Sequence, residues 1–418
     1  MIHSLRGFRD ILPPDSERFT AIEAAAREVF SLYGYHEIRI PTLEARELFV
    51  KSTGDTTDIV QKEMYAFTDQ GGREIAARPE GTPGVVRAYI ENNLAQSGGN
   101  GKFFYIGSMF RAERPQAGRY REFEQIGAEC IGAHSPFADA ESISLLMEIL
   151  SKAGVSGCLA ELNSLGCAEC RAAYRAELLA YLKANTAALC PACQARLERN
   201  PLRALDCKLD GPRLALAAPC VKLCPNCLDH FSRVQELLSS SNAQFRINKS
   251  LVRGLDYYTR TVFEVKTGAL GSQDAIAGGG RYDDLVKSMS GPDAPAVGWA
   301  LGVDRLALLT KDAAATPAAT QVFVICAQPA GVEASAKAFA LLGELRAAGI
   351  RTDFSDFGLS LKSQLRSADK SGASLALILG EEEVKNSVYT LKFLKEKKDQ
   401  RTVPAAGITP VIRAALSQ

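Results

Sequence analysis

Apolar residues recur every three or four positions between residues 16 and 33, which is the spacing of one face of an α-helix. Asp15 or Ser16 can cap this helix at its start, and Gly34 lies just beyond its end. The next run, HEIRIPTLE, has the composition of a short strand interrupted by Pro41. The N-terminal pattern therefore predicts a helix followed by a broken strand.

Two longer apolar segments lie on either side of a polar loop between residues 102 and 131. KFFYIGSMFRAE leads into the loop RPQAGR, and YREFEQIGAECI leads out of it. This order of strand, loop and strand predicts a long β-hairpin. The helical spacing of residues 138–153 predicts a helix after it.

The run LVRGLDYYTRTVFEV, residues 251–265, consists mostly of strand-forming residues. Successive side chains on a strand point to opposite faces, so a regular strand cannot direct both Tyr257 and Tyr258 to the face of Arg253. We therefore expect a bend at residues 254–256. The following segment AIAGGGRYDDLV predicts a Gly-rich turn, and AVGWALGVDRLALLT predicts a strand and then a helix.

Residues 320–418 follow a different pattern. They come after KDAAATPAAT, residues 311–320, which has the composition of a linker. Apolar runs such as VFVIC and LALIL then alternate with helical segments in the order βαβαβ. This order predicts a parallel-rich sheet whose strands are buried on both faces.

These patterns predict an α/β (α+β) protein of several domains. Residues 158–241 carry most of the eleven cysteines on short helical pieces, and we interpret them as a small insertion domain. The insertion would divide a first domain into residues 1–157 and 242–311, and residues 320–418 would form a separate domain. The length of 418 residues agrees, since single cores rarely grow so large.

Composition narrows the class of protein. Hydrophobic residues make up 46% and charged residues 23% of the chain, as in soluble globular proteins. The formal net charge of +1 indicates no nucleic-acid partner, although a local basic surface can be balanced elsewhere. No signal core or membrane-spanning run is visible. We expect a cytoplasmic protein with no membrane association, whose cysteines are thiols or metal ligands.

Three arginines stand beside apolar, structured segments, namely Arg111, Arg253 and Arg305. Each one taken alone is most simply a solvated surface residue. Burial of an arginine without a partner is costly, whereas several arginines that converge on one pocket suit a polyphosphate. The choice depends on whether folding brings the three together.

Five segments carry a resemblance to a known family. FRAE with its basic loop and REFEQ resembles motif 2 of the class II aminoacyl-tRNA synthetases, and GWALGVDRLALL resembles motif 3. RPEGT, LVRGLDYYTRTVFE and AGGGRYDDL resemble segments peculiar to histidyl-tRNA synthetases. The resemblance covers the whole chain. It implies a class II antiparallel-sheet catalytic domain, a small Cys-rich helical insertion and a C-terminal α/β anticodon-binding domain.

The resemblance also implies a reaction. ATP would activate L-histidine to histidyl-adenylate, and the histidyl group would pass to the 3′ end of tRNA-His. Arg111 would hold the α-phosphate and Arg305 the γ-phosphate, while Arg253 would contact the α-phosphate and the histidine carboxylate. Mg²⁺ is expected on the phosphates. The other residues implied for ATP are Glu113, Arg119 and Phe123, the last stacked on adenine.

A histidine site is implied in the same way. Glu129 and Tyr258 would address the imidazole, whose single donor and single acceptor suit a carboxylate and a phenol. The α-ammonium group would be bound by Glu80, Thr82 and Gln125. The residues implied to line the rest of this site are Arg111, Arg253, Tyr257 and Tyr282.

The resemblance implies macromolecular partners as well. Arg114 and Gln116, in the hairpin loop, match loop residues that the family uses near the acceptor end of tRNA-His. A homodimer is implied, with motif 1, around residues 21–41, in its interface. Residues 320–418 carry 13 basic and 10 acidic side chains, a net charge of +3, which is compatible with anticodon binding without being diagnostic.

The cysteines of the insertion have metal-ligand spacing. They are Cys167, Cys170, Cys190, Cys193, Cys207, Cys220, Cys224 and Cys227. Eight thiolates are enough for two four-thiolate zinc sites. The family reaction needs no zinc, however, so reduced thiols are the alternative. We assign no metal-ligating residue from the sequence.

Two other functions are compatible with such a fold. One is a catalytically silent, synthetase-like regulatory subunit of histidine biosynthesis, but such proteins typically lack the terminal domain and lose catalytic positions that this chain retains. The other is a tRNA-binding sensor, which would leave the arginines unexplained. Histidine-dependent ATP–pyrophosphate exchange distinguishes an enzyme from both.

Overall fold

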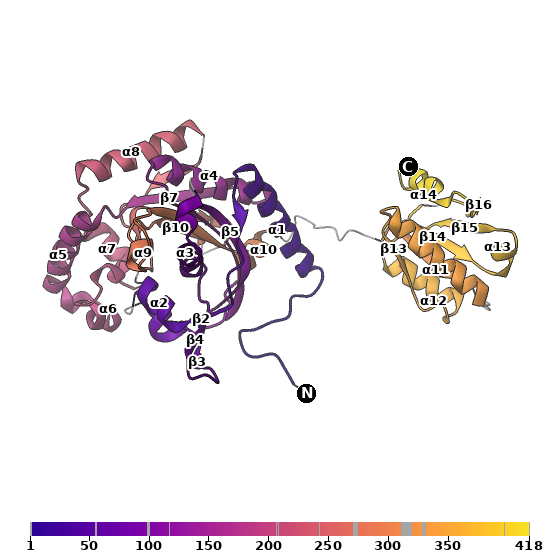
Figure 1. The fold of residues 1–418 in the computed structure, drawn as a ribbon, viewed down its shortest axis with the longest axis horizontal. Coiled ribbons are helices and arrows are strands. Elements are labelled where there is room, and N and C mark those ends of the chain that lie inside the picture. The colour runs from indigo at the N-terminus through magenta and orange to yellow at the C-terminus, as the bar shows by residue number, and fades with distance from the viewer. Residues whose placement is uncertain are drawn as a thin grey trace. The chain divides into compact units, whose positions relative to one another are not determined.

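The computed structural model describes residues 2–54, 57–97, 101–116, 118–205, 207, 209–241, 243–270, 275–310, 320–327, 332–396 and 398–417. The chain forms two units, Met1–Ala315 and Thr316–Gln418, each with its own hydrophobic core (Figure 1). Nearly all of the predicted linker, residues 311–320, lies outside the described residues.

An eight-stranded sheet forms the centre of the first unit. Its order is β1 (His36–Glu37), β5 (Gly101–Phe110), β6 (Glu122–Ile131), β11 (Ala296–Gly302), β10 (Ala275–Arg281), β9 (Thr259–Thr267), β7 (Cys158–Ser164) and β8 (Phe245–Ile247). From β5 to β7 neighbouring strands are antiparallel, whereas β1 and β8 join the edges in parallel. β5 and β6 form the predicted hairpin, and the predicted antiparallel sheet is confirmed.

Four helices cover one face of this sheet. They are α1 (Asp15–Leu32), α4 (Pro136–Lys152), α8 (Pro225–Ser240) and α10 (Val303–Leu309). In the core beneath them the Phe30 ring stacks on Phe104, with centroids 4.2 Å apart. The predicted N-terminal and 138–153 helices are confirmed, but the predicted cap is wrong. The side chain of Asp15 pairs with Arg18 instead, and the helix starts after Pro14 without a side-chain cap.

The opposite face carries the candidate site. Helices α3 (Thr82–Glu91) and α9 (Leu285–Ser288) pack there over a second core that includes Tyr105, Met109 and Val262, and α2 (Arg46–Thr53) packs against these two helices. A three-stranded sheet lies beside them, in the order β2 (Leu43–Ala45), β4 (Glu74–Ala77) and β3 (Ala66–Thr68). The remaining short elements are a π-helix, η1 (Ile59–Glu63), and two 3₁₀ helices, η2 (Leu94–Ser97) and η5 (Gly268–Leu270). Because Pro41 separates β1 from β2, the broken strand is confirmed.

Two predicted elements differ in the structure. Residues 251–258 contain the expected bend, at residues 254–257, but they are not strand, and β9 begins only at Thr259. The bend buries both tyrosines, which a continuous strand could not do. The predicted Gly-rich turn at residues 275–286 is mostly wrong, because its first half is the strand β10. Its glycines leave room for neighbouring side chains instead.

The cysteine-rich insertion is helical. It consists of α5 (Ala168–Ala184), η3 (Thr186–Ala188), α6 (Pro191–Arg196), η4 (Pro201–Ala204), α7 (Gly211–Ala217) and α8. Leu178, Leu182, Leu189 and Leu214 form its small core. Its predicted start at residue 158 needs correction, since Cys158–Ser164 is β7 of the main sheet, paired with β9.

The second unit has the predicted strand–helix alternation. Its elements are β12 (Val322–Cys326), α11 (Val332–Ala347), β13 (Thr352–Phe354), α12 (Leu361–Lys370), β14 (Leu375–Leu379), α13 (Glu381–Lys385), β15 (Val388–Phe393), β16 (Arg401–Pro404) and α14 (Ile408–Leu416). The sheet order is β13-β12-β14-β15-β16, with the first three strands parallel and the last two antiparallel. Among the described residues, none of the helices has the length and apolarity needed to cross a membrane.

Candidate active site

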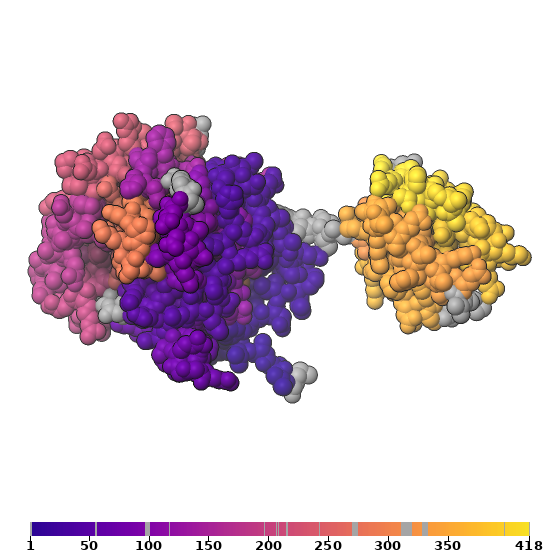
Figure 2. All heavy atoms as spheres, in the orientation of Figure 1, coloured from indigo at the N-terminus to yellow at the C-terminus, as the bar shows by residue number. Residues whose placement is uncertain are grey.

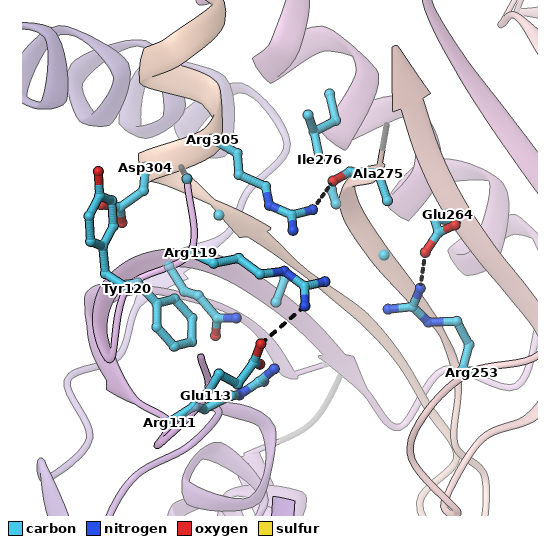
Figure 3. Close-up of a pocket in the computed structure, with 17 residues that line it drawn as sticks. Arg111, Glu113, Arg119, Tyr120, Arg253, Glu264, Ala275, Ile276, Asp304 and Arg305 are labelled. Atoms are coloured by element: carbon cyan, nitrogen blue, oxygen red, sulfur yellow. Dashed lines mark hydrogen bonds and ion pairs between the residues drawn. The ribbon is translucent and has the colours of Figure 1, made fainter. Parts of the chain in front are cut away.

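A cavity of about 250 Å³ opens on the sheet face that carries α2, α3 and α9. Arg111, Arg253 and Arg305, which come from three distant segments, all line it. In Figure 3 the guanidinium groups of Arg253 and Arg305 point into one central space, together with Arg119 from the hairpin loop. Folding therefore brings the three arginines together, as a polyphosphate site requires.

Each arginine is fixed by a contact outside the cavity centre. Arg111 donates from Nε to the carbonyl of Pro79 at 2.8 Å. Arg253 donates from Nη1 to Glu264 Oε1 at 2.7 Å, and Arg305 donates to the carbonyl of Ala275. Such contacts orient the guanidinium groups before any ligand arrives, which lowers the entropy lost on binding.

Electrostatics favour an anion in this cavity. Burial lowers the pKa of Arg305, and the positive charge of Arg119 lowers it further. A lowered pKa means that the site disfavours one more positive charge, so a bound anion would relieve the repulsion. The carboxylates of Glu113 and Glu264 line the cavity too, and Glu113 pairs with Arg119 at 3.1 Å.

The glycines of β10 make room for Arg253. A Cβ on Gly278 would lie 2.3 Å from Arg253 Nη2, so only glycine lets the guanidinium group rest on this strand. A Cβ on Gly279 would lie 2.2 Å from the carbonyl oxygen of Gly298 on β11. The Gly-rich segment thus shapes the floor of the cavity.

A second, enclosed cluster of polar side chains belongs to the same face. Glu129, on β6, accepts hydrogen bonds from Thr82 Oγ1 at 2.6 Å and from the hydroxyl of Tyr282. Glu80 accepts from the hydroxyl of Tyr257 at 3.0 Å and from Thr53 Oγ1 at 3.3 Å. These contacts involve five of the nine residues predicted to bind histidine, namely Glu80, Thr82, Glu129, Tyr257 and Tyr282.

Burial controls the protonation of this cluster. It raises the pKa of Glu129 to about 8, although hydrogen bonds from Thr82 and Tyr282 act in the opposite direction. Burial likewise raises the pKa of Glu80, and Arg111 partly offsets that effect. Carboxyls with raised pKa values suit a site that takes up a cation or a hydrogen-bonding ring.

Tyr258 enters the cluster because the backbone bends before it. Its ring centroid lies 4.7 Å from that of Tyr257, and burial raises the pKa of Tyr258 to about 12. The bulge continues at Arg260, whose φ of 44° accompanies a register shift between β9 and β10. Adjacent tyrosines thus share one pocket, which a regular strand would not allow.

Of the remaining predicted residues, some line the cavity and others lie outside it. Phe123 lines it, and the guanidinium carbon of Arg111 lies 5.4 Å from the centroid of its ring. Gln125 is buried at 8% exposure, and its Oε1 has no hydrogen-bond partner among the described residues. Arg114 and Gln116 are exposed in the hairpin loop and stay outside the cavity.

Sequence reasoning missed three positions near the site. Glu264 holds Arg253, and its signal was a lone carboxylate in the apolar run TVFEV. Asp304 is buried at 4% exposure, accepts from the backbone N–H of Glu124 at 2.9 Å, and pairs with Arg9 at 2.8 Å. Thr53 supports Glu80, and no local pattern marks it.

Comparisons with known families agree with this geometry. A family model described as histidyl-tRNA synthetase matches residues 7–306, and one described as anticodon binding domain matches residues 321–414. A histidine–tRNA ligase of Elusimicrobium minutum is 54% identical over 400 residues, which cover 96% of each chain. A histidine–tRNA ligase of Desulfosudis oleivorans is 46% identical over 418 aligned positions, which cover 98% of each chain.

Solved structures show the same fold. The apo histidyl-tRNA synthetase of S. aureus superposes with a TM-score of 0.83 at 30% identity, covering 99% of this chain and all of that one. A Bacillus halodurans protein described as an ATP phosphoribosyltransferase regulatory subunit/histidyl-tRNA synthetase has a TM-score of 0.66 at 22% identity, covering 91% of this chain and 98% of that one. The second likeness concerns the fold alone.

Proposed function

The chain belongs to the histidyl-tRNA synthetase family, and we propose that its open cavity binds ATP while its enclosed polar cluster binds histidine. The protein is an ATP-dependent histidine–tRNA ligase: it activates histidine as the adenylate and transfers it to tRNA. Its full-length relatives favour this activity over that of a regulatory subunit. The assignment of individual residues is our proposal.

Arginines supply the charge for the first step. Attack of the histidine carboxylate on the α-phosphorus releases pyrophosphate and spreads negative charge over the phosphate oxygens. Arg111 would hold the α-phosphate and Arg305 the γ-phosphate. Arg253 would bind the α-phosphate and the attacking carboxylate together. Fixed cations in a partly buried cavity stabilise such a transition state without reorganising.

Adenine would stack on Phe123, close to the Glu113–Arg119 ion pair. The ring of Phe123 lines the cavity and already has a cation beside it in Arg111, a pairing that suits a flat π system. Glu113 and Arg119 would then lie near the base.

The enclosed cluster would read the amino acid at both ends. Glu80, Thr82 and the unpartnered Gln125 Oε1 offer acceptors to the α-ammonium group. Glu129 and Tyr258 would bond the imidazole, with Tyr257 and Tyr282 closing the pocket. An amino acid with an apolar side chain would leave these buried groups unpaired, which costs on the order of 1–3 kcal/mol for each group.

Magnesium fits the open cavity by its donor set. Glu113 and Glu264 present carboxylate oxygens there, and Mg²⁺ prefers oxygen ligands, mostly water and phosphate with one or two carboxylates. We propose that one of these two carboxylates, together with water and phosphate oxygens, holds the ion, which when bound would neutralise phosphate charge.

The partners are tRNA, histidine and ATP. Arg114 and Gln116 would contact the acceptor end of tRNA-His, since their side chains are exposed beside the cavity. Cytoplasmic localisation is our proposal as well. It is supported by the eleven cysteines, all of which are unpaired in the structure, as a reducing compartment would keep them.

We also propose a homodimer through motif 1. Leu32, within that segment, and Leu43, just after it, are 71% and 48% exposed, and β1 forms an edge of the main sheet. Exposed apolar side chains next to an unpaired strand edge favour contact with a second chain. Sedimentation of the purified protein measures its mass, and a monomer at micromolar concentration would contradict the proposal.

The convergence of Arg111, Arg253 and Arg305 on one cavity is the observation that carries the ATP assignment. Arg253→Ala is the sharpest test, because this residue would touch both reacting groups. We expect histidine-dependent ATP–pyrophosphate exchange to fall about 100- to 1000-fold in kcat, the usual effect of losing one transition-state donor. The KM values for ATP and histidine should change much less.

Arg233→Ala is the matched control, since Arg233 is exposed on α8 and pairs only with its neighbour Glu236 in the contacts described. Near-normal exchange by Arg253→Ala would contradict the role assigned to Arg253. Equal losses in both variants would point to general damage rather than to lost catalysis.

A further inference from the structure

Four cysteine sulfurs meet where the insertion leaves and rejoins the catalytic sheet. They belong to Cys167, Cys170, Cys224 and Cys227, and all lie within 4.8 Å of one another. The sulfurs of Cys167 and Cys170 are 3.7 Å apart. A tetrahedral ion with metal–sulfur bonds of about 2.3 Å would hold its sulfurs about 3.8 Å apart. The sulfurs thus already have the spacing of a zinc site.

Backbone amides are aimed at these sulfurs in a reciprocal pattern. The N–H of Cys167 donates to Cys227 Sγ, and the N–H of Cys224 donates to Cys170 Sγ, both at 3.2 Å. Amide donors stabilise a thiolate more than a thiol. Cys170 and Cys227 are also buried, at 5% and 1% exposure, so their charge would need a cation close by.

A second cluster lies inside the insertion and contains one carboxylate. Cys190, Cys193, Cys207 and Asp210 have their ligand atoms within 4.8 Å of one another, and the sulfurs of Cys190 and Cys207 are 3.7 Å apart. Asp210, 5% exposed, also accepts from the N–H of Cys190 at 3.0 Å. Cys220 is exposed and belongs to neither cluster. The sequence had suggested cysteine for every ligand.

We propose that the insertion binds two zinc ions, one through four thiolates and one through three thiolates and Asp210. Closed four-ligand sites of this composition are structural rather than catalytic, because no position is left for a substrate. The insertion has only a small core, so bound metal would supply a large part of its stability.

The two sites would also brace the bend that precedes β9. Arg171, next to Cys170, donates to the carbonyl of Tyr258 at 2.9 Å. Between Cys193 and Cys207, Asn200 donates to Asp256 Oδ1 at 2.9 Å, and Arg203 donates to the carbonyl of Gly254. Figure 2 shows the insertion, magenta to pink, packed directly against the orange atoms of the following catalytic segment. Metal binding would therefore position Arg253 and Tyr258.

Metal analysis of the full-length protein tests the sites directly. Protein produced with added zinc should retain about two equivalents after dialysis. Cys224→Ser and Cys190→Ser should each retain about one, whereas Cys220→Ser, the matched control, should retain two. Substoichiometric zinc in the parent protein, or equal zinc in all three variants, would overturn the proposal.

Cobalt substitution of the parent protein makes the test independent of variant folding. Two Co²⁺ ions in tetrahedral thiolate sites should give intense sulfur-to-cobalt charge-transfer absorption. A spectrum like that of octahedral Co²⁺ in water, or a failure of the protein to bind Co²⁺, would contradict thiolate ligation. Loss of both metals to a chelator should lower the melting temperature, and an unchanged value would contradict a structural role.

The bracing role rests on the proposed function of Arg253 and Tyr258, so it needs a separate readout. Arg171→Ala should raise the KM for histidine about tenfold with two zinc ions still bound, while Lys222→Ala, an exposed change in the same insertion, should not. If Arg171→Ala kept both zinc ions and an unchanged KM for histidine, the bracing role would be refuted, but the zinc sites would not. Normal histidine kinetics in both Arg171→Ala and Arg253→Ala would instead refute the assigned function.

Discussion

At the scale of single residues, Glu129 is a carboxyl whose surroundings change its protonation. It is fully buried, and burial raises its pKa to about 8 despite two hydrogen bonds that favour the charged form. At neutral pH most of the folded protein therefore carries a neutral carboxyl at this position. A neutral carboxyl and a neutral imidazole can share one proton between them, which suits recognition of histidine without a buried net charge.

Glu129→Gln is expected to change how stability depends on pH. The folded-state pKa of about 8 exceeds the ordinary value of 4.5, so this group's stabilising contribution is complete below pH 4.5 and is lost as pH rises through 8. Gln does not titrate. The melting temperature of Glu129→Gln relative to the parent should therefore rise by about 4 °C between pH 6 and pH 8.

Calorimetry across this pH range measures that difference. Glu122→Gln is the control, because Glu122 is exposed on the same strand, and its difference from the parent should stay constant. A constant difference for Glu129→Gln as well would show that the pKa is not raised.

Gln116→Ala should separate the two steps of the reaction. The side chain of Gln116 is exposed, and the backbone groups of Gln116 and Arg119 bond each other in both directions, so the loop should keep its shape. We expect kcat/KM for tRNA to fall about tenfold, the effect of about one lost hydrogen bond. Pyrophosphate exchange should stay within about twofold of the parent. Equal losses in both assays would refute a role in tRNA contact.

At the scale of elements, the sequence predicted a helix or strand correctly wherever the element's own residues determine its secondary structure. The helices α1 and α4 and the hairpin β5–β6 followed from periodicity, because one face of each is buried in a regular way. β10 did not follow. Its glycines look like a turn, but they leave space for Arg253 and for the backbone of β11, which lie elsewhere in the sequence.

The same distinction between local pattern and tertiary packing explains which features of the site could be predicted from the sequence. Arg111, Arg253 and Arg305 were predictable as partners in one site because the motifs contain them, whereas Glu264 and Asp304, which also line the cavity, were missed. The hydrogen bonds that join Glu129 to Tyr282, and Glu264 to Arg253, depend on tertiary packing. The bend before β9 was predictable from adjacent tyrosines, since a strand offers them no common face. The second cysteine cluster contains Asp210 where the sequence had suggested Cys220 as the fourth ligand. This could not be predicted, because no spacing rule marks Asp210 as a metal ligand.

Neighbouring glycines of β10 should respond differently to alanine. In Gly278→Ala the new Cβ meets the guanidinium group of Arg253, which is flexible and can move away. Stability should change by less than about 1 kcal/mol while pyrophosphate exchange falls about 100-fold. In Gly279→Ala the Cβ meets backbone atoms of β11 that cannot move, so unfolding should become easier by several kcal/mol.

Urea unfolding and exchange kinetics of the two variants test this contrast. The opposite order, with Gly278→Ala unstable and Gly279→Ala inactive but stable, would show that β10 does not shape the cavity as described.

At the scale of the whole molecule, the two units have separate hydrophobic cores. The core around Val324, Leu341, Leu377 and Ile412 is built only from residues of the second unit. All residues of the open cavity and of the enclosed cluster belong to the first. Activation of histidine and recognition of the anticodon should therefore be separable.

A chain that ends at Ala315 should keep the first activity and lose most of the second. We expect histidine-dependent pyrophosphate exchange within about threefold of the parent, because no catalytic side chain is removed. Aminoacylation should lose about 100-fold in kcat/KM for tRNA, corresponding to about 2.7 kcal/mol of binding energy. If exchange fell as far as aminoacylation, the second unit would be needed for the first to fold or act.

The strand order of the main sheet has a consequence for how the protein folds while it is being synthesised on the ribosome. β6 pairs with β11, and Ile131 lies opposite Ala296. The backbone of Ile131 therefore cannot form this pairing until about 165 more residues have been synthesised. At about 5–20 residues per second this interval lasts on the order of ten to thirty seconds. Throughout it, an apolar strand edge stays open to any other nascent chain. Until β11 is synthesised, this edge of β6 is therefore a place where one nascent chain can pair with another.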